Sequence, residues 1–316
     1  MTQTAVEAAV APKSQPRRRR NPITWVQRGG LSTLLFLLPL LLIFGVFSWT
    51  PIVEAVVMSF QKTNLVTAPV FVGWENFEAV FRDPLFYTAM RNTAYFALLA
   101  LIFGYPLPLL AAVMMSEFRR AKGFYGVLAY LPVIIPPVVS VLLWKIFYDA
   151  GPNGVFNTIL GFVGIPPQPW IQSQVQAMPS LVLEATWAAA GSTVIIYLAA
   201  LTSVAPELYD AAEVDGASIW GKIWHVTLPQ LRGILFITLI LQIIATAQVF
   251  LQPFLFTSGG PANSTTTILL LIYQYAFTSS LGVGVGKATA LSLMLAVFLA
   301  VLSIAYFRVT RRWSDN

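Results

Sequence analysis

The chain has 316 residues, of which 57% are hydrophobic and only 10% are charged. A soluble domain usually carries about 25% charged residues, so this composition excludes a water-soluble monomer. The net charge is +6, and the absence of cysteine together with a single histidine, His225, excludes disulfides, zinc-thiolate sites, thiol nucleophiles and multi-histidine metal or catalytic sites.

Residues 1–30 are polar, contain proline and include the basic run Arg17 to Arg20, so we expect a largely disordered basic tail. The apolar run 31–53 follows a basic region, as the core of a signal peptide would. It is too long for that role, and no small-residue cleavage site follows it. We therefore expect it to remain as the first membrane helix of a domain covering residues 31–316.

Further apolar stretches are each long enough to cross about 30 Å of hydrocarbon as a helix of roughly 20 residues. They lie at 92–115, 124–148, 180–203, 233–256 and 288–307. Between the first two spans, 72–84 suits either a short amphipathic helix on the outer interface or an irregular loop. Prolines interrupt the uncharged stretch 150–183, which is predicted to be an external loop with a short helix near 156–162. The fold class is therefore all-α and polytopic, with six transmembrane helices.

The distribution of basic residues predicts the orientation. Placing the tail, the loops 116–123 and 204–232 and the C-terminus in the cytoplasm puts 14 of the 19 Lys and Arg residues inside. Four remain outside (Lys62, Arg82, Arg91 and Lys287), and Lys145 lies near a helix end. This asymmetry predicts that both termini are cytoplasmic. It also accounts for the positive charge without a nucleic-acid partner.

The third and fourth spans contain candidates for a solute pathway. Ser140, Trp144 and Tyr148 recur at four-residue spacing, and aromatic faces can stack on the C–H faces of sugars. Trp and Tyr also populate membrane interfaces for structural reasons. In the fourth span, Glu184 and Trp187 share a face with Gly191, which would place a hydrogen-bond acceptor beside an aromatic ring. The alternative for Glu184 is a hydrated or paired position at the outer helix end.

The fifth span adds two glutamines to these candidates. Gln248 and Gln252 are four residues apart and so share a helical face. Isolated glutamines can equally hold a helix bundle together through interhelical hydrogen bonds. Near the end of the third span, Lys145 and Asp149 are expected to form an i to i+4 surface pair.

The loop 204–232 is predicted to form two short helices joined by a glycine. Pro206 suits a first helical turn, and Gly216 can take the left-handed conformation that ends the helix. Ser218 suits the N-cap of a second helix over 219–226, before Leu228-Pro229 turns the chain into the next span.

Small and acidic residues of this loop suit contact with another protein. The small side chains of Ala211 and Ala212 allow another protein to approach one face of the first helix closely. Glu213 and Asp215 can meet basic residues of that partner. His225 is interpreted as an interfacial side chain on a cytoplasmic helix.

The run Tyr209-Asp210-Ala211-Ala212-Glu213-Val214-Asp215-Gly216-Ala217, followed by Val226-Thr227-Leu228-Pro229, resembles the EAA loop of ABC-importer permeases. That loop docks on the ATPase in the family. Asp210 stands at the family's usual glutamate and Val226 at its usual isoleucine. Gly73-Trp74-Glu75-Asn76-Phe77, Arg91-Asn92-Thr93, Gly259-Gly260-Pro261 with Thr266, and Tyr273 to Phe277 look like the carbohydrate-uptake subgroup, in its larger-permease type.

The resemblance implies the type I importer fold and the transport subunit of a carbohydrate importer in a bacterial or archaeal cytoplasmic membrane. It implies as partners a second homologous permease, two copies of a cytoplasmic ATPase and an extracytoplasmic solute-binding protein. The residues it assigns to coupling are Asp210, Ala211, Ala212, Glu213, Asp215, Gly216, Leu228 and Pro229. The chain lacks the G-x-x-x-x-G-K-[ST] phosphate loop. ATP and magnesium are therefore expected on the ATPase, and neither enzymatic activity nor a bound cofactor is expected here.

Two other functional classes fit parts of the sequence. An ion-coupled secondary transporter would use Glu184, Lys145 and Asp149 as coupling charges and would take up solute without a partner. A membrane scaffold without transport activity would dock a partner on the 204–232 loop and show no solute flux.

Overall fold

The computed structural model of the protein describes residues 30–117, 122–278 and 284–314, so the tail predicted for 1–30 lies outside the described residues except for its last position. The chain divides into two compact units, residues 1–54 and 55–316. In the first, α2 (Gly30–Phe44) and a π-helical turn (Gly45–Trp49) lead into α3 (Thr50–Ser59). Large apolar side chains are exposed on all sides of this helix, as expected for contact with lipid.

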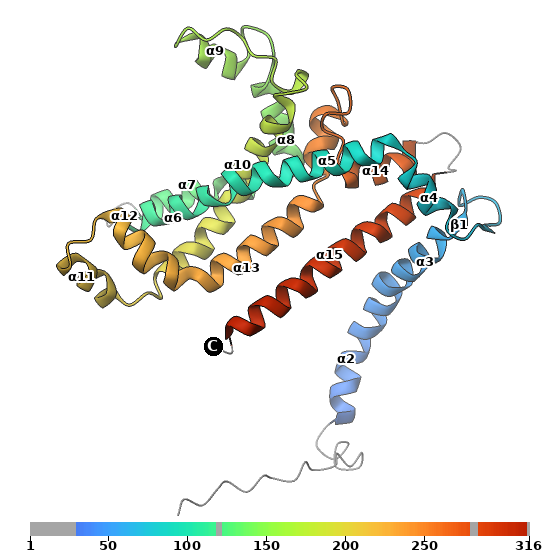
Figure 1. Ribbon diagram of the computed structural model, residues 1–316, viewed down its shortest axis with the longest axis horizontal. Helices are drawn as coiled ribbons and strands as arrows, with labels where there is room; N and C mark the ends of the chain where they lie inside the picture. Colours follow the sequence, from blue (N-terminus) through green and yellow to red (C-terminus); the bar gives the residue numbers. More distant parts are fainter. Residues whose placement is uncertain (1–29, 118–121, 279–283, 315–316) are drawn as a thin grey trace, which may run out of the picture. The chain divides into compact units, whose positions relative to one another are not determined.

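The second unit is a helical bundle with one small sheet (Figure 1). Strands β1 (Gln61–Lys62) and β2 (Val70–Phe71) pair antiparallel, with Gln61 opposite Phe71. The helices in chain order are α4 (Glu75–Phe81), α5 (Pro84–Leu99), the π turn η2 (Ala100–Gly104), α6 (Pro106–Glu117), α7 (Lys122–Ile134), α8 (Pro137–Phe147), α9 (Val155–Gly161), the 3₁₀ turn η3 (Trp170–Gln172), α10 (Ala177–Leu201), α11 (Pro206–Val214), α12 (Ile219–Lys222), the π turn η4 (Ile223–Thr227), α13 (Leu228–Ala247), the π turn η5 (Pro253–Thr257), α14 (Ile268–Tyr273), the π turn η6 (Gln274–Thr278) and α15 (Val285–Ser314).

Among the described residues, five continuous helical stretches are long and apolar enough to cross a membrane, or six if one bent pair counts as a span. The five are Leu31–Ser59, Pro84–Ser116, Ala177–Leu201, Ile219–Ala247 and Val285–Arg308. Of the two alternatives for 72–84, the structure has the short helix, α4, and the short helix predicted near 156–162 is present as α9. The second span begins earlier than predicted because Asp83 caps it and Pro84 occupies its first turn.

Three spans accommodate a proline by means of a wider turn. A five-residue π turn ends two residues before each of Pro51, Pro106 and Pro229. A proline in a helix has no N–H to donate, and its ring collides with the carbonyl four residues earlier. In each case that carbonyl belongs to the π turn, which displaces it. The helix from Ile219 to Ala247 is therefore continuous, and the expectation that Leu228-Pro229 turns the chain is wrong.

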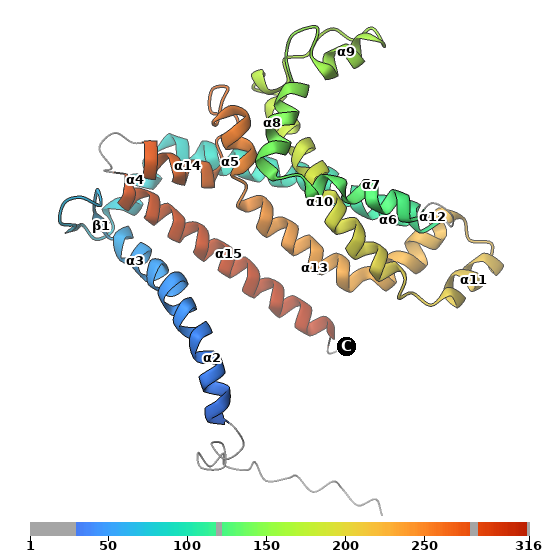
Figure 2. The same ribbon diagram turned by 180° about the vertical axis from the view of Figure 1, so that it is seen from behind.

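The predicted third span is sharply bent, and its prolines Pro132, Pro136 and Pro137 predict such a kink from the sequence. Its two halves, Gly123–Ile134 and Pro137–Phe147, meet at an angle of 97°, and Figures 1 and 2 show α8 leaving the direction of α7. Pro136 and Pro137 are adjacent, so two successive N–H donors are missing and Pro136 adopts an extended conformation (ψ 131°). The chain bends here because a single π turn cannot accommodate two prolines in succession.

Helix α10 is the centre of the second unit and packs against α5, α6, α7, α8 and α13. Gly191 permits the closest of these approaches, because a Cβ at this position would overlap the backbone carbonyl oxygen of Ala129 in α7. Small residues are used in this way where membrane helices meet. Gly191 is thus explained by packing.

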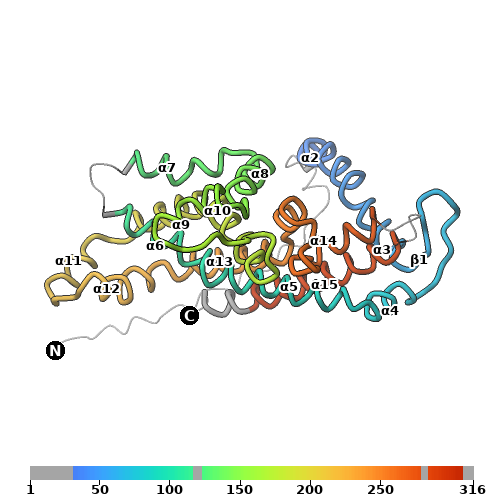
Figure 3. Tube along the Cα trace, turned by 90° about the horizontal axis from the view of Figure 1, so that it is seen from above, coloured from blue at the N-terminus to red at the C-terminus, as the bar shows by residue number. Residues whose placement is uncertain are grey.

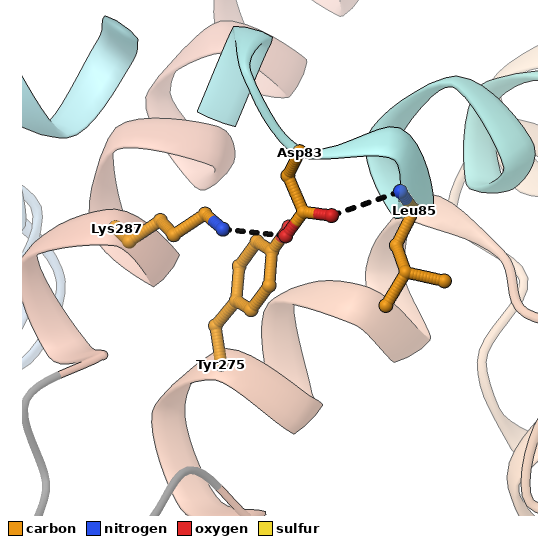
Figure 4. Close-up of polar contacts among 4 residues, drawn as sticks. All are labelled: Asp83, Leu85, Tyr275 and Lys287. Carbon is orange, nitrogen blue, oxygen red and sulfur yellow. Dashed lines mark hydrogen bonds and ion pairs between the residues drawn. The ribbon is translucent and has the colours of Figure 1, made fainter. Parts of the chain in front are cut away.

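At the end of the second unit where α4 and β1 lie, an ion pair joins the start of α5 to α15 (Figure 4). Asp83 Oδ1 accepts the Leu85 N–H at 2.9 Å, while Oδ2 accepts from Lys287 Nζ at 2.5 Å and from the Tyr275 hydroxyl at 2.7 Å. Lys287 Nζ also lies 4.1 Å from the centroid of the Tyr275 ring. Burial raises the pKa of Asp83, but the hydrogen bonds from Lys287, Tyr275 and Leu85 outweigh it and hold that pKa below 3.8.

Two asparagines hold the loops at this end. The side-chain amide of Asn76 donates to two carbonyls in residues 59–61, at 2.9 and 3.0 Å. Asn92 donates to the carbonyl oxygens of Asn263 and Thr266, at 2.7 and 3.0 Å. Buried turn carbonyls require such donors, because they would otherwise lack a hydrogen-bond partner. Two of the short segments that resemble the carbohydrate subgroup therefore have a structural use.

We expect Asp83→Asn to destabilise the protein at pH 7, since it keeps an acceptor for Leu85 and removes the charge opposite Lys287. The pKa of Asp83 in the folded protein lies below its ordinary value of 3.8. The ion pair therefore stabilises the fold at pH values above 3.8, and this contribution is lost as the pH falls through the folded-state pKa. The loss should be about 1–3 kcal/mol. Thermal unfolding of the purified complex in detergent measures it.

Arg82→Gln is the control, because the ion pair that Arg82 forms among the described residues is an exposed i to i+4 contact with Glu78. Its unfolding midpoint should stay near that of the wild type. An Asp83→Asn midpoint as high as the control's would show that the buried pair does not stabilise the bundle.

Candidate functional site

The first candidate region is the 204–232 loop, where α11 and α12 lie at the end of the second unit away from α4 and β1 (Figure 3). As predicted, α11 begins at Pro206 and the chain turns at Gly216, whose φ is +74°. Ser218 caps α12, and its Oγ accepts the Gly221 N–H at 3.2 Å. The predicted helix, glycine and second helix are all present.

Two contacts inside the loop fix the two helices against each other. The hydroxyls of Tyr209 and Thr227 are 3.1 Å apart, and Lys222 Nζ donates to Glu213 Oε2 at 2.7 Å. The hydrogen bond from Lys222 lowers the pKa of the exposed Glu213 carboxyl. The sequence predicts that Glu213 meets a basic residue of another protein. In the structure its carboxylate is already paired with Lys222 of the same loop.

The other acidic residues of the loop are open to a partner. Asp210 and Asp215 are exposed, and their side chains make no hydrogen bond or ion pair with the residues that the structure describes. Ala211 and Pro229 are exposed as well, whereas Ala212 and Leu228 are half-buried.

Large apolar side chains of the same loop are exposed as well. Val214 is 88% exposed, Ile219 76%, and Trp220 and Trp224 64% each. His225 is exposed and lies within 3.0 Å of the Gly221 carbonyl oxygen. Contiguous exposed apolar residues bordered by charges are typical of a protein or membrane interaction surface. The loop has the composition of a docking element.

The second candidate region is a buried cluster around Glu184, which is 1% exposed. Ser140 Oγ donates to Glu184 Oε1 at 2.6 Å, and Gln252 Nε2 donates to Oε2 at 3.3 Å. These three residues come from α8, α10 and the segment between α13 and η5. Glu184 is therefore not at a hydrated helix end, and both of its oxygens are hydrogen-bonded as a buried carboxyl requires.

Aromatic rings form one wall of this cluster. The Trp144 ring centroid lies 5.4 Å from that of Trp187 and 5.6 Å from that of Tyr148. The Tyr148 hydroxyl donates to the Ser180 carbonyl oxygen at 2.8 Å. Trp144 is 8% exposed, yet its Nε1–H has no hydrogen-bond partner among the described residues. A buried donor without a partner is costly and is a candidate for contact with a ligand.

Gln248 lies apart from this cluster. It is exposed, and its amide donates to the Ile244 carbonyl oxygen one turn earlier. The expectation that it shares a helical face with Gln252 is wrong, because α13 ends at Ala247 and the helical spacing is interrupted there.

The expected pair of Lys145 and Asp149 is also absent from the described contacts. Lys145 Nζ donates to the Leu255 carbonyl oxygen at 3.3 Å, and Asp149 Oδ1 accepts the Gly151 N–H at 2.8 Å. Each side chain satisfies a backbone group where a helix ends or a turn begins, which competes with the i to i+4 pair.

Several cluster residues were not anticipated because they lie in the 150–183 loop or beyond α13. The rings of Phe156, Trp170 and Phe256 pack against Tyr148. Asn157, 2% exposed, holds the loop by donating to three carbonyls and by accepting from Trp170 Nε1 at 2.8 Å. Only the bend at the paired prolines brings this loop to the cluster, so no spacing in the sequence indicates it.

Comparison with known proteins gives both regions a context. The family model described as "Binding-protein-dependent transport system inner membrane component" matches residues 104–315. The arabinooligosaccharides transport system permease protein AraP of Bacillus subtilis is 32% identical over 237 residues, which cover 74% of this chain and 75% of that protein. The lactose transport system permease protein LacF of Rhizobium radiobacter is 31% identical over 239 residues, covering 74% and 79%.

A solved structure shares the fold. A chain in the crystal structure of a bacterial ABC transporter involved in the import of the acidic polysaccharide alginate matches with a TM-score of 0.80 and 28% identity, over 92% of this chain and 98% of that one. A chain in the structure of bacterial alginate ABC transporter in complex with alginate pentasaccharide-bound periplasmic protein matches with a TM-score of 0.79.

The hydrogen bond between Ser140 and Glu184 predicts coupled effects on stability. Glu184→Leu leaves two donors unpaired and should lower the unfolding midpoint by an amount equivalent to about 1–3 kcal/mol. Ser140→Ala should lower it less. The double variant should lose less than the sum, with a coupling of about 0.5–2 kcal/mol. Thermal unfolding of the purified complex measures all three.

Thr202→Ala is the matched control, because the Thr202 hydroxyl donates to the Ala199 carbonyl oxygen in its own helix turn and lies about 27 Å along the helix from Glu184. Glu184→Leu and Thr202→Ala should be additive. Additivity for the pair with Ser140 would contradict the direct bond.

Proposed function

The chain belongs to the family of binding-protein-dependent transport system inner membrane components, and we propose that it is the permease subunit of an ATP-driven importer for an oligosaccharide or a related carbohydrate. The observation that carries the proposal is the match in sequence to permeases of arabinooligosaccharide and lactose transport systems, together with the match in fold to a chain of an ABC transporter involved in alginate import. The substrates in these names are all built from linked sugar units.

The proposed complex contains this chain, a second homologous permease, two copies of a cytoplasmic ATPase and an extracytoplasmic solute-binding protein. ATP and magnesium bind to the ATPase subunits. Fourteen of the 19 Lys and Arg residues lie in the N-terminal tail, the 116–123 and 204–232 loops and the C-terminus, which supports a cytoplasmic location for these segments. The 204–232 loop then faces the compartment that contains ATP.

In this proposal the 204–232 loop carries motion between the ATPase and the membrane helices. Asp210, Asp215 and the exposed side chains of Val214 and Trp220 offer charged and apolar contacts to the ATPase. A partner that moves α11 moves α12 with it, because the Glu213–Lys222 pair and the Tyr209–Thr227 contact join them. Since α12 continues into α13 through η4, the displacement reaches the bundle without a flexible joint.

The cluster around Glu184 is the proposed solute pathway in this subunit. Its carboxyl and the Gln252 amide can accept and donate hydrogen bonds to sugar hydroxyls, and the rings of Trp144 and Trp187 suit the C–H faces of a sugar. Ligand sites combine apolar walls with a few placed polar groups in this way. The unpaired Trp144 N–H supplies a donor that no described residue uses.

Uptake into proteoliposomes tests the proposal and the coupling role together. The reconstituted complex should take up oligosaccharide only with ATP and the binding protein. Gly216→Val should lower that uptake by tenfold or more with assembly unchanged. A β-branched residue at φ +74° costs about 1–3 kcal/mol, and relieving that strain rotates α11 against α12.

Gly164→Val is a closely matched control. Gly164 has φ +75°, and at Gly164 as at Gly216 an added Cβ would meet no atom within 4 Å. Gly164 lies in the external loop, so its replacement should leave coupling intact. Normal uptake by Gly216→Val would refute the coupling role, and uptake by this chain alone on an ion gradient would favour a secondary transporter.

Trp144→Phe separates a pathway role from a packing role. Phenylalanine keeps an aromatic ring but removes the N–H and part of the indole volume, and the lost N–H has no described partner. The unfolding midpoint should therefore fall by a packing cost of about 1 kcal/mol and by no hydrogen-bond cost. The concentration of solute-loaded binding protein giving half-maximal uptake, or the maximal rate, should change about 3- to 30-fold if a sugar hydroxyl uses this donor.

Trp170→Phe is the contrasting variant, because its N–H bonds to Asn157. It should lower the midpoint by a similar packing cost and by about 1 kcal/mol more for the lost hydrogen bond. If Trp144→Phe changes stability but not uptake, Trp144 serves the core alone.

A further inference from the structure

A groove lies between the N-terminal part of α13 and the C-terminal part of α15, away from the Glu184 cluster, and one end of it falls in the last residues of the 204–232 loop. It encloses about 760 Å³. Its lining residues are Gln230, Arg232, Gly233, Phe236, Ile237, Ile240, Leu241, Ile244, Ser303, Tyr306 and Phe307. Figures 1 and 2 show the two helices running side by side. The stacked rings of Phe236 and Tyr306, with centroids 5.3 Å apart, bring the two helices together beside it.

The groove has the length of one bilayer leaflet. Its lining on α13 runs from Gln230 to Ile244, which is about 21 Å at 1.5 Å per residue. Half of a bilayer is about 20–22 Å thick including its headgroups. Apolar residues from Phe236 to Ile244 line the deeper part, and the polar and charged lining residues on α13, Gln230 and Arg232, lie at its N-terminal end, in the last residues of the 204–232 loop.

That end is positively charged without a nearby acid in either helix. The sequences of α13 and α15 contain no Asp or Glu. Arg232 makes no hydrogen bond or ion pair with the described residues, and Arg308, two residues beyond Tyr306 in α15, is exposed. Basic positions between membrane helices on the cytoplasmic side are typical binding sites for anionic lipid headgroups.

We propose that this groove binds one anionic phospholipid of the inner leaflet, with its phosphate at Arg232 and an acyl chain along α13 as far as Ile244. The assignment of this end to the inner leaflet rests on the proposed function. A helix of the second permease is the competing occupant, and it would leave Arg232 in the interface without a counter-charge from this chain. A phosphate supplies that charge, and the acyl chain fills the apolar part.

Lipid retention by the intact purified complex tests the site. The complex is delipidated in mild detergent, incubated with equimolar phosphatidylglycerol and phosphatidylcholine, washed, and its bound lipid is counted by mass spectrometry. The wild type should retain phosphatidylglycerol in preference. Arg232→Gln should lower that preference about fivefold, the factor corresponding to the ~1 kcal/mol that one basic residue contributes at a lipid surface.

Gly233→Leu tests the apolar part, because a Cβ at Gly233 meets nothing within 4 Å and leucine favours the helix. It should lower retention of both lipids by filling the groove. Controls are Arg82→Gln, which removes a charge outside the spans, and Gly126→Leu, which adds the same bulk to α7 where space is also open. Both should retain lipid as the wild type does.

Three results would overturn the proposal. They are a wild type without preference for phosphatidylglycerol, site variants that retain lipid as the controls do, and a Gly233→Leu complex that loses its second permease on gel filtration while lipid counts stay unchanged. The number of bound lipids can be measured on a complex that does not transport, so the lipid site and the proposed function are tested separately. If phosphatidylglycerol is retained as expected while reconstituted uptake fails, the proposed function is refuted and the lipid site stands.

Discussion

The structure depends on one constraint, which is that every backbone polar group in hydrocarbon must find a partner within the protein. Proline removes a backbone N–H donor. Pro39 and Pro132 lie inside α2 and α7 without a π turn, but at five other prolines the helix geometry changes in one of two ways. Before Pro51, Pro106 and Pro229 a π turn preserves a continuous helix. At Pro136 and Pro137 the helix breaks by 97°. The first solution gives rigid spans, and the second redirects α8 so that Ser140 and Trp144 meet α10.

A related requirement, that buried polar groups find hydrogen-bond partners, explains the buried polar residues. Asn76, Asn92 and Asn157 each donate to two or three carbonyls of neighbouring loops, which would otherwise lack partners. Glu184 is satisfied by Ser140 and Gln252 from two other elements. The Trp144 N–H stands out because it is buried and, among the described residues, unpaired where these side chains converge. A polar solute would complete the arrangement.

Rigidity and exposure are divided between the two ends of the second unit. At the end near α4, Asp83, Lys287 and the asparagines fasten the loops to the helices. At the opposite end, α11 and α12 are fixed to each other but expose Val214, Ile219 and Trp220. The groove between α13 and α15 adjoins this end. This division suits a protein that receives force at one end and resists it at the other.

The sequence by itself determined the membrane class, the six apolar stretches, the helix, glycine and helix of the 204–232 loop, and the likeness to ABC-importer permeases. Those features depend on local composition, on the length of apolar runs and on one glycine conformation. Only the tertiary structure decided that Glu184 is buried, that Gln252 and not Gln248 reaches it, and that Phe156 and Trp170 join the cluster. These contacts follow from where α8 points and where α13 ends, because hydrogen bonds between distant segments depend on helix directions that no spacing along the chain specifies.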